Sequence, residues 1–221
     1  MDKPKILLIG CGKMGGSLLE GIAKSDNNFN LIDVVDPVIN ESYKKKFKTS
    51  KTNFYSDIRE LKDRINYDSI IVATKPSNYI EIFDDLKNHR IVNGETLVVS
   101  ILAGVKIKKI EDVIGSIAII RAMPNIASSV AEGMTALVGN KKINNDQISA
   151  VNIIFQSIGN KIWLEDEDQM DSFTAIAGSG PAYFFYFTEC LQKIAIAEGF
   201  SENIAKQISE QIIIGSGKLI K

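Results

Sequence analysis

Short apolar runs alternate with longer segments of helical period along residues 1–163. The runs have the length of strands, and their apolar residues are consecutive rather than alternating, which predicts a parallel sheet covered by crossover helices on both faces. The predicted strands are residues 6–9, 31–35, 69–73, 96–99, 117–120, 134–138 and 161–164. The predicted helices are residues 14–24, a lysine-rich segment ending near Lys48, 76–86 and 147–157.

The pattern changes after Trp163. From Glu165 onward every segment has helical period, with breaks only at 178–181 and 199–201, and Ser201 is a suitable N-cap for the last helix. We therefore expect an α/β domain over residues 1–163 and an all-helical domain over residues 164–221. The helical domain has more apolar surface than isolated helices can bury, which predicts a homodimer or higher homo-oligomer through it. The residues concerned are Ile194, Ile196, Ile204, Ile208, Ile212, Ile213, Ile214, Leu219 and Ile220.

Composition excludes several classes of protein. The chain has 221 residues, of which 45% are hydrophobic and 24% charged, as in an ordinary globular protein. Lys and Arg number 26 against 27 Asp and Glu, so the net charge of −1 gives no general attraction to nucleic acid or to an anionic membrane. Neither a signal-peptide core nor an apolar stretch of about 20 residues is present, which predicts a cytoplasmic protein. Two cysteines and one histidine argue against a metal site.

Residues 10–15 read Gly-Cys-Gly-Lys-Met-Gly, a G-x-G-x-x-G motif placed directly after a predicted strand and opening a helix. Gly10 permits the tight turn, Gly12 lets a pyrophosphate approach the backbone, and Gly15 lets the helix pack closely on the strand. The acidic Asp36 follows at the end of the second strand. This context predicts a dinucleotide site; the alternative is a glycine-rich turn in a packed α/β domain.

Asp36 bears on which dinucleotide binds. A carboxylate at this position accepts hydrogen bonds from the ribose 2′-hydroxyl of NAD and repels the 2′-phosphate of NADP, which favours NADH. Alternatively, Asp36-Pro37 forms only a turn. Lysines crowd the following segment, either as a solvated helix face or as cations that would weaken the preference for NADH. They are Lys44, Lys45, Lys46, Lys48 and Lys51.

Further segments resemble one family, in its order and over essentially the whole chain. The glycine loop is common to many dinucleotide-binding proteins, but the Met-Pro-Asn and Gly-Ser-Gly-Pro-Ala-Tyr segments are more particular, and with them the chain resembles pyrroline-5-carboxylate reductase. The matching segments are residues 9–15, 73–76, 99–105, 121–125, 132–133 and 171–183.

The resemblance implies the final step of proline biosynthesis, in which NAD(P)H transfers a hydride to the imine carbon of 1-pyrroline-5-carboxylate, the future C5 of proline, and L-proline is formed. It implies a Rossmann-type dinucleotide-binding domain followed by a helical dimerisation domain, and NADPH as the family's usual cofactor. The cofactor contacts that it implies are Ile9, Gly10, Cys11, Gly12, Lys13, Met14, Asp36, Ser56, Ala73, Thr74, Lys75, Pro76, Ile101, Leu102 and Ala103. The substrate contacts that it implies are Glu167, Thr174, Ser179 and Gly180.

Two of these side chains have alternative interpretations. Glu167 could favour the iminium form of the substrate by its opposite charge, or it could belong to a solvated acidic helix start. Lys75 could reach the nicotinamide amide or the substrate carboxylate, or it could simply close a strand. No side chain stands out as a dedicated general acid, so the proton for the ring nitrogen could come from solvent.

The chain departs from the family pattern at three places. Residues 126–128 are Ile-Ala-Ser where the family usually has Thr-Pro-Ala, and Asp36 replaces a small hydroxyl residue. The sequence ends at Lys221 without the family's Ser-Pro-Gly-Gly-Thr loop, which binds the substrate carboxylate across the dimer. The helical domain is therefore expected to be truncated. An alternative function is a cofactor-binding dimer without turnover, either regulatory or degenerate.

Overall fold

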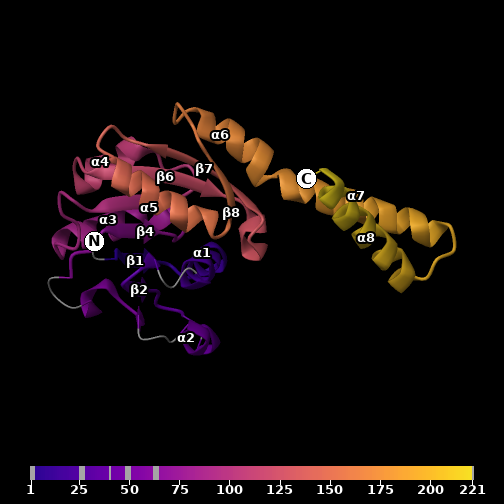
Figure 1. The fold of residues 1–221 in the computed structure, drawn as a ribbon, viewed down its shortest axis with the longest axis horizontal. Helices are drawn as coiled ribbons and strands as arrows, with labels where there is room; N and C mark the ends of the chain where they lie inside the picture. The colour runs from indigo at the N-terminus through magenta and orange to yellow at the C-terminus, as the bar shows by residue number, and fades with distance from the viewer. Residues whose placement is uncertain (1–2, 25–27, 40, 48–50, 62–64, 221) are drawn as a thin grey trace. The chain divides into compact units, whose positions relative to one another are not determined.

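The computed structural model describes residues 3–24, 28–39, 41–47, 51–61 and 65–220 (Figure 1). They form two compact units, Met1–Phe173 and Thr174–Lys221. Unit 1 is an α/β layer structure and unit 2 is helical, which confirms the predicted fold class. The division falls after Phe173 rather than near Trp163, because Leu164, Met170 and Phe173 pack against the apolar core of unit 1.

Unit 1 contains an eight-stranded sheet in the order β3-β2-β1-β4-β5-β6-β7-β8. All neighbouring pairs from β3 to β6 are parallel, β7 runs antiparallel to β6, and β8 is parallel to β7. The strands are β1 Lys5–Ile9, β2 Leu31–Val35, β3 Thr52–Tyr55, β4 Ser69–Val72, β5 Leu97–Ser100, β6 Ala118–Pro124, β7 Gly133–Gly139 and β8 Gly159–Trp163. The seven predicted strands are confirmed. The edge strand β3 was not identified, because its Thr-Asn-Phe-Tyr sequence lacks an apolar run.

Helices cover both faces of the sheet, as predicted. Alternate strand residues point to opposite faces, and each set packs in its own buried cluster: Leu7 and Val98 with α3 and α4, Leu8 and Val99 with α1 and α5. The helices of unit 1 are α1 Lys13–Lys24, α2 Glu41–Phe47, α3 Tyr79–Asn88, α4 Ile107–Ile114, α5 Asn145–Gln156 and α6 Gln169–Phe173, with 3₁₀ turns η2 Ile58–Glu60, η3 Pro76–Asn78 and η4 Ile126–Val130. The sequence pattern did not identify α4, and Lys48, the expected end of α2, lies outside the described residues.

In the described part of the chain, Asp33 is one of two charged residues buried inside the apolar strands; the other is Arg121 of β6. Asp33 lies in the middle of β2 with a fully buried side chain. Its carboxylate accepts hydrogen bonds from the Tyr67 hydroxyl at 2.6 Å and from the side-chain amide (Nδ2) of Asn53 at 2.9 Å. Burial, followed by the hydrogen bond to Asp33, raises the pKa of Tyr67 well above its usual value, so the phenol stays protonated and keeps donating.

Unit 2 consists of a π-helical turn, η5 (Thr174–Gly178), and two helices, α7 (Gly180–Ala197) and α8 (Glu202–Ile220). The predicted break at 178–181 is too wide, since Gly180 and Pro181 belong to the first turn of α7, where proline is tolerated. The second break is confirmed: Gly199 has a φ of +92°, and the Ser201 hydroxyl accepts from the Ile204 amide at 3.5 Å at the start of α8.

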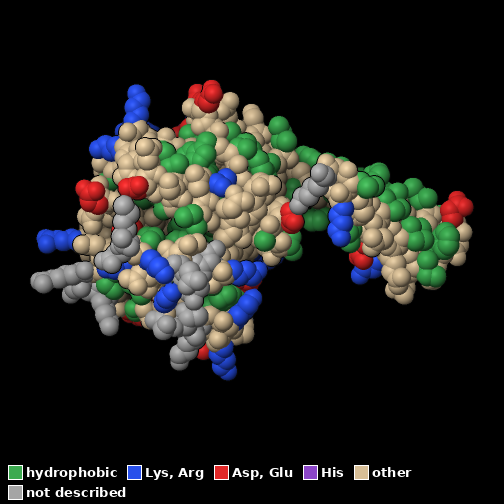
Figure 2. All heavy atoms as spheres, viewed as in Figure 1, with side chains coloured by type: hydrophobic (Ala, Val, Ile, Leu, Met, Phe, Trp, Pro, Cys, Tyr) green, Lys and Arg blue, Asp and Glu red, His purple; other side chains and the backbone are tan. Residues whose placement is uncertain are grey.

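Unit 2 leaves much of its apolar surface uncovered. Five consecutive aromatic residues of α7, numbers 183–187, are 54–68% exposed. Figure 2 shows hydrophobic side chains spread over α7 and α8. No helix in the described part of the chain is long and apolar enough to cross a membrane.

Candidate active site

A cleft of about 770 Å³ lies at the carboxyl ends of β1, β2, β3 and β4. Ligands of open α/β sheets bind at this edge, and the volume is in the usual range for a small-molecule site. The cleft brings together many of the expected cofactor residues, which come from four separate loops. They are Ile9, Gly10, Gly12, Asp36, Ser56, Ala73, Thr74, Lys75 and Pro76.

The glycine loop has the geometry that its sequence predicts. Gly10 has a φ of +91°, and a Cβ there would come within 2.7 Å of the Ala73 carbonyl oxygen. A Cβ on Gly15 would lie 2.0 Å from the Gly10 carbonyl oxygen, so both positions require glycine for the fold itself. Gly12 is different, since a Cβ there would meet no atom within 4 Å. Gly12 therefore leaves open space beside the N-terminus of α1, where a pyrophosphate would fit.

Asp36 ties the glycine loop to the end of β2. One carboxylate oxygen accepts from the Cys11 amide at 2.6 Å, and the other accepts from the Val38 amide at 2.8 Å. The second bond is the Asx-type turn that was the alternative interpretation of Asp36-Pro37. The turn does not exclude a role for Asp36 in binding the ribose, because each carboxylate oxygen can accept more than one hydrogen bond and the residue lines the cleft.

Two further carboxylates lie near this end of the cleft, at the end of β3. The Glu60 carboxylate accepts from both the amide and the hydroxyl of Ser56. Asp57 binds Arg59 through the guanidinium Nε at 2.8 Å and also accepts from the Arg59 amide at 2.8 Å. The guanidinium and this amide hold the pKa of Asp57 well below its usual range. Ser56 is thus already bonded, and the nearby guanidinium is already paired.

The cleft has an acidic lining. Asp36, Asp57, Glu81 and Asp85 contribute carboxylates, and Lys75 is the only cationic residue among the described residues that line it. The lysines of α2 do not line it: Lys44 pairs with Glu41 and Lys46 pairs with Glu20.

The other expected cofactor residues flank this cleft or lie on the next loop. Lys13 and Met14 line a separate pocket of about 540 Å³ together with Ile126. Burial and the nearby Asp36 raise the pKa of the Cys11 thiol to about 11, which keeps it protonated. The loop after β5 contains Ile101, Leu102 and Ala103. Leu102 is buried, whereas Ala103 is exposed.

Glu167 is bonded within unit 1. Its Oε1 accepts from the Arg121 guanidinium at 2.9 Å and from the Ile107 amide, the first of α4, also at 2.9 Å. Arg121 is only 4% exposed and Glu167 is 21% exposed. The carboxylate is therefore not a freely solvated helix start. The three other expected substrate residues lie together in unit 2, where Thr174 opens η5, Ser179 is the N-cap of α7, and Gly180 is its first residue.

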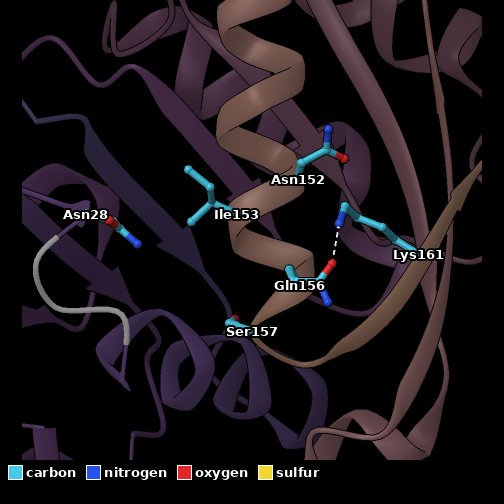
Figure 3. A pocket seen from close by; sticks show the side chains of 6 residues that line it. All are labelled: Asn28, Asn152, Ile153, Gln156, Ser157 and Lys161. Atoms are coloured by element: carbon cyan, nitrogen blue, oxygen red, sulfur yellow. Dashed lines mark hydrogen bonds between the residues drawn. The ribbon is translucent and has the colours of Figure 1, made fainter.

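The sequence pattern missed Asp57, Glu60 and Arg121. The first two lie next to β3, which itself went unrecognised, and Arg121 was included only as part of the Arg-Ala-Met-Pro-Asn segment. A charged residue inside an apolar strand was the available signal for Arg121, because such a group needs a buried partner. A shallower groove of about 420 Å³, on α5 and β8, contains none of the expected site residues (Figure 3). Its Lys161 ammonium donates to the Gln156 side chain at 2.6 Å.

Comparisons with known proteins show which family the chain is similar to. The profile described as "Pyrroline-5-carboxylate reductase dimerisation" matches residues 167–221, and the profile "NADP oxidoreductase coenzyme F420-dependent" matches residues 5–104. The pyrroline-5-carboxylate reductase of Methanosarcina acetivorans is 31% identical over 99% of this chain and 80% of its own length. That of Aquifex aeolicus is 33% identical over 98% and 78%.

Solved structures give the same result. The pyrroline-5-carboxylate reductase of Coxiella burnetii has a TM-score of 0.87 and 30% identity, covering 99% of this chain and 80% of that one. The Plasmodium falciparum pyrroline carboxylate reductase, with NADP bound, has a TM-score of 0.82 and 30% identity, covering 100% and 79%. By identity and coverage together, this chain belongs to the pyrroline-5-carboxylate reductase family.

Proposed function

We propose that the protein reduces 1-pyrroline-5-carboxylate to L-proline with a nicotinamide dinucleotide. When bound, the coenzyme would supply a hydride for the imine carbon, which becomes C5 of L-proline, and the ring nitrogen takes up a proton. The observation that carries the proposal is the cleft itself: an open Gly12 at the start of α1, with Asp36 and the 73–76 loop around it, in a chain whose relatives carry this activity. No side chain is assigned as a proton donor.

The cleft residues bind and orient the coenzyme in this proposal. The amides at the start of α1 face the pyrophosphate beside Gly12, and the acidic end at Asp36 holds the adenosine ribose. The 73–76 loop and residues 101–103 follow β4 and β5, which are adjacent in the sheet, and they contact the nicotinamide half. Lys75, the cation of this cleft, faces the nicotinamide amide or the substrate carboxylate.

We propose that the coenzyme preferred is NADH. Asp36 and Asp57 follow the neighbouring strands β2 and β3, which the bond from the Asp36 amide to the Tyr55 carbonyl holds together at 3.0 Å. A 2′-phosphate placed here would face both carboxylates, while a ribose hydroxyl could donate to them. Arg59 is bonded to Asp57, which reduces its availability for a phosphate.

The substrate half is proposed on unit 2, where Thr174, Ser179 and Gly180 lie around the N-terminus of the 18-residue helix α7. The Ser179 side chain makes no capping bond to the helix, and a Cβ on Gly180 would meet nothing within 4 Å. The amides at a helix N-terminus can accept a carboxylate such as that of the substrate.

We also propose a homodimer through α7 and α8. A buried aromatic side chain contributes roughly 150–250 Å². Covering the exposed part of residues 183–187 would therefore bury roughly 500 Å² on each protomer, a large share of the ~800 Å² per partner of a standard interface. A cytoplasmic location, expected from the sequence, stays a prediction.

Steady-state kinetics test the proposal most simply. We expect the protein to reduce 1-pyrroline-5-carboxylate with a higher kcat/KM for NADH than for NADPH. The same sample is expected to sediment as a dimer or a larger oligomer. Coenzyme binding without turnover would instead support the cofactor-binding dimer. Faster turnover with NADPH would contradict the role given to Asp36 while leaving the reductase activity intact.

A further inference from the structure

Arg121 and Glu167 form the most buried ion pair of the described residues, and the assignment of Glu167 as a substrate contact does not explain its geometry. Arg121 lies two residues after Ile119 in β6, so both side chains point to the same face of the sheet, the one covered by α3 and α4. A guanidinium 4% exposed needs a partner, because an unpaired buried charge is strongly destabilising. Glu167 is that partner.

The same carboxylate oxygen also anchors the start of α4. Ile107 is the first residue of this helix, and its amide has no partner inside the helix. The preceding Lys106 provides no side-chain cap, so Glu167, although distant in sequence, supplies the acceptor at 2.9 Å. A negative charge at this end also interacts favourably with the helix dipole. Glu167 thus connects β6 and α4 through a single atom.

The segment between β5 and α4 is the one that carries Ile101, Leu102 and Ala103. It is fixed at its beginning by the bond from the Ile101 amide to the Val72 carbonyl at 3.0 Å. It turns tightly at Gly104, where φ is +73°, and it ends at Ile107 on the Glu167 carboxylate. Glu167 therefore provides the backbone bond at the far end of this loop, next to the exposed ion pair between Lys106 and Asp168.

We propose that Glu167 is a positioning residue for the coenzyme: together with Arg121 it holds the 101–106 loop in the place where that loop contacts the nicotinamide half. This inference rests on the proposed function, since it takes the loop as part of the coenzyme site. It differs from a direct substrate contact in one measurable respect. A positioning residue affects NADH binding when no substrate is present, whereas a substrate contact does not.

The test is NADH binding without substrate, measured by calorimetry on the full chain. Glu167→Gln weakens the carboxylate bonds and is expected to raise the Kd for NADH about tenfold, as for residues that act through an intermediate element. The matched control is Asp112→Asn on α4. It removes an exposed ion pair with Lys108, outside the 101–106 loop, and should leave the Kd unchanged.

A second variant separates positioning from general stability. The apolar pair Arg121→Met with Glu167→Leu removes the buried guanidinium together with its half-buried partner, which is often neutral for stability, so its Tm should exceed that of Glu167→Leu alone. Its NADH affinity should remain low, because the Ile107 amide still lacks its acceptor. Recovery of affinity together with Tm would overturn the proposal in favour of a purely structural pair.

The remaining outcomes are also decisive. An unchanged NADH Kd in Glu167→Gln overturns the proposal, and if the KM for 1-pyrroline-5-carboxylate rises at the same time, Glu167 contacts the substrate instead. A wild-type chain that binds neither NADH nor NADPH overturns both this inference and the proposed function. A wild type that binds and turns over, with no effect in Glu167→Gln, overturns this inference alone.

Discussion

Replacing Gly12 by valine should abolish coenzyme binding and leave the fold intact. The three glycines of the loop differ in this respect: Gly10 and Gly15 cannot accept a Cβ without moving backbone atoms, whereas Gly12 faces open space. Its φ also lies outside the left-handed region, so a β-branched side chain can adopt the backbone conformation. Only the space reserved for the coenzyme is filled by the substitution.

The expected magnitude follows from the contacts that valine would block. A hydrogen bond between a backbone amide and a charged phosphate contributes roughly 1.5–3 kcal/mol, so loss of two such bonds would cost roughly 3–6 kcal/mol of binding free energy. Since each 1.4 kcal/mol is about a factor of ten, affinity should fall at least about 100-fold. The free energy of unfolding should change by no more than about 1 kcal/mol, the scale of a glycine substitution at an unstrained position.

Calorimetric titration with NADH, paired with thermal unfolding, measures both quantities. The matched control is Gly94→Val. Gly94 also has open space around it, but it precedes β5 and so lies near the amino ends of the strands, whereas the cleft lies at their carboxyl ends. We expect normal NADH affinity in Gly94→Val and, in both variants, a Tm within about 4 °C of the wild-type value. Wild-type affinity in Gly12→Val would refute the placement of the pyrophosphate at this loop.

Three further substitutions test separate features of the molecule. Asp36→Ser should raise the ratio of NADPH to NADH affinity by about tenfold, since a like-charge repulsion is removed, even though both affinities fall with the lost loop contacts; an unchanged ratio would exclude Asp36 from cofactor selection. Tyr67→Phe leaves the buried Asp33 carboxylate short of a donor and should lower the free energy of unfolding by about 1–3 kcal/mol, measured by urea denaturation; a change within about 0.5 kcal/mol would contradict the buried bond. Cys190→Ser leaves Cys11 as the thiol to be measured. Because the pKa of Cys11 is raised to about 11, this thiol should alkylate slowly at neutral pH and about tenfold faster with each pH unit up to that value; a rate that levels off at lower pH would refute the raised pKa.

The parallel sheet could be predicted because its central strands are buried on both faces and therefore have continuous apolar runs. The edge strand β3 lies where this rule no longer applies, and Thr52–Tyr55 gives no comparable signal. The reversal at β7 was not visible either. A strand's direction depends on the length and path of its connection, and the short 3₁₀ turn η4 between β6 and β7 replaces a crossover helix.

The candidate site, like the sheet, could be predicted only in part from the sequence. The glycine loop could be predicted because its motif follows a strand and opens a helix, although the contact of Gly10 with the Ala73 carbonyl is made only in the folded sheet. The partner of Ser56, Glu60, is only four residues away and was missed because the segment around β3 went unrecognised. The partner of Glu167 could not be predicted, because Arg121 is 46 residues before it in the chain and only the folded sheet brings the two together. The sequence could therefore suggest a role for Glu167 but could not show that its carboxylate is already bonded.

The most direct test of the account follows the hydride. With NADH deuterated at the transferable position of C4 and 1-pyrroline-5-carboxylate as substrate, mass spectrometry and NMR of the product should show L-proline with one deuterium at C5, formed in equal amount to the NADH oxidised. This result would establish that the chain binds a coenzyme that transfers its hydride to the imine. Firm NADH binding without proline, or proline without deuterium, would contradict the assignment of this chain as a pyrroline-5-carboxylate reductase.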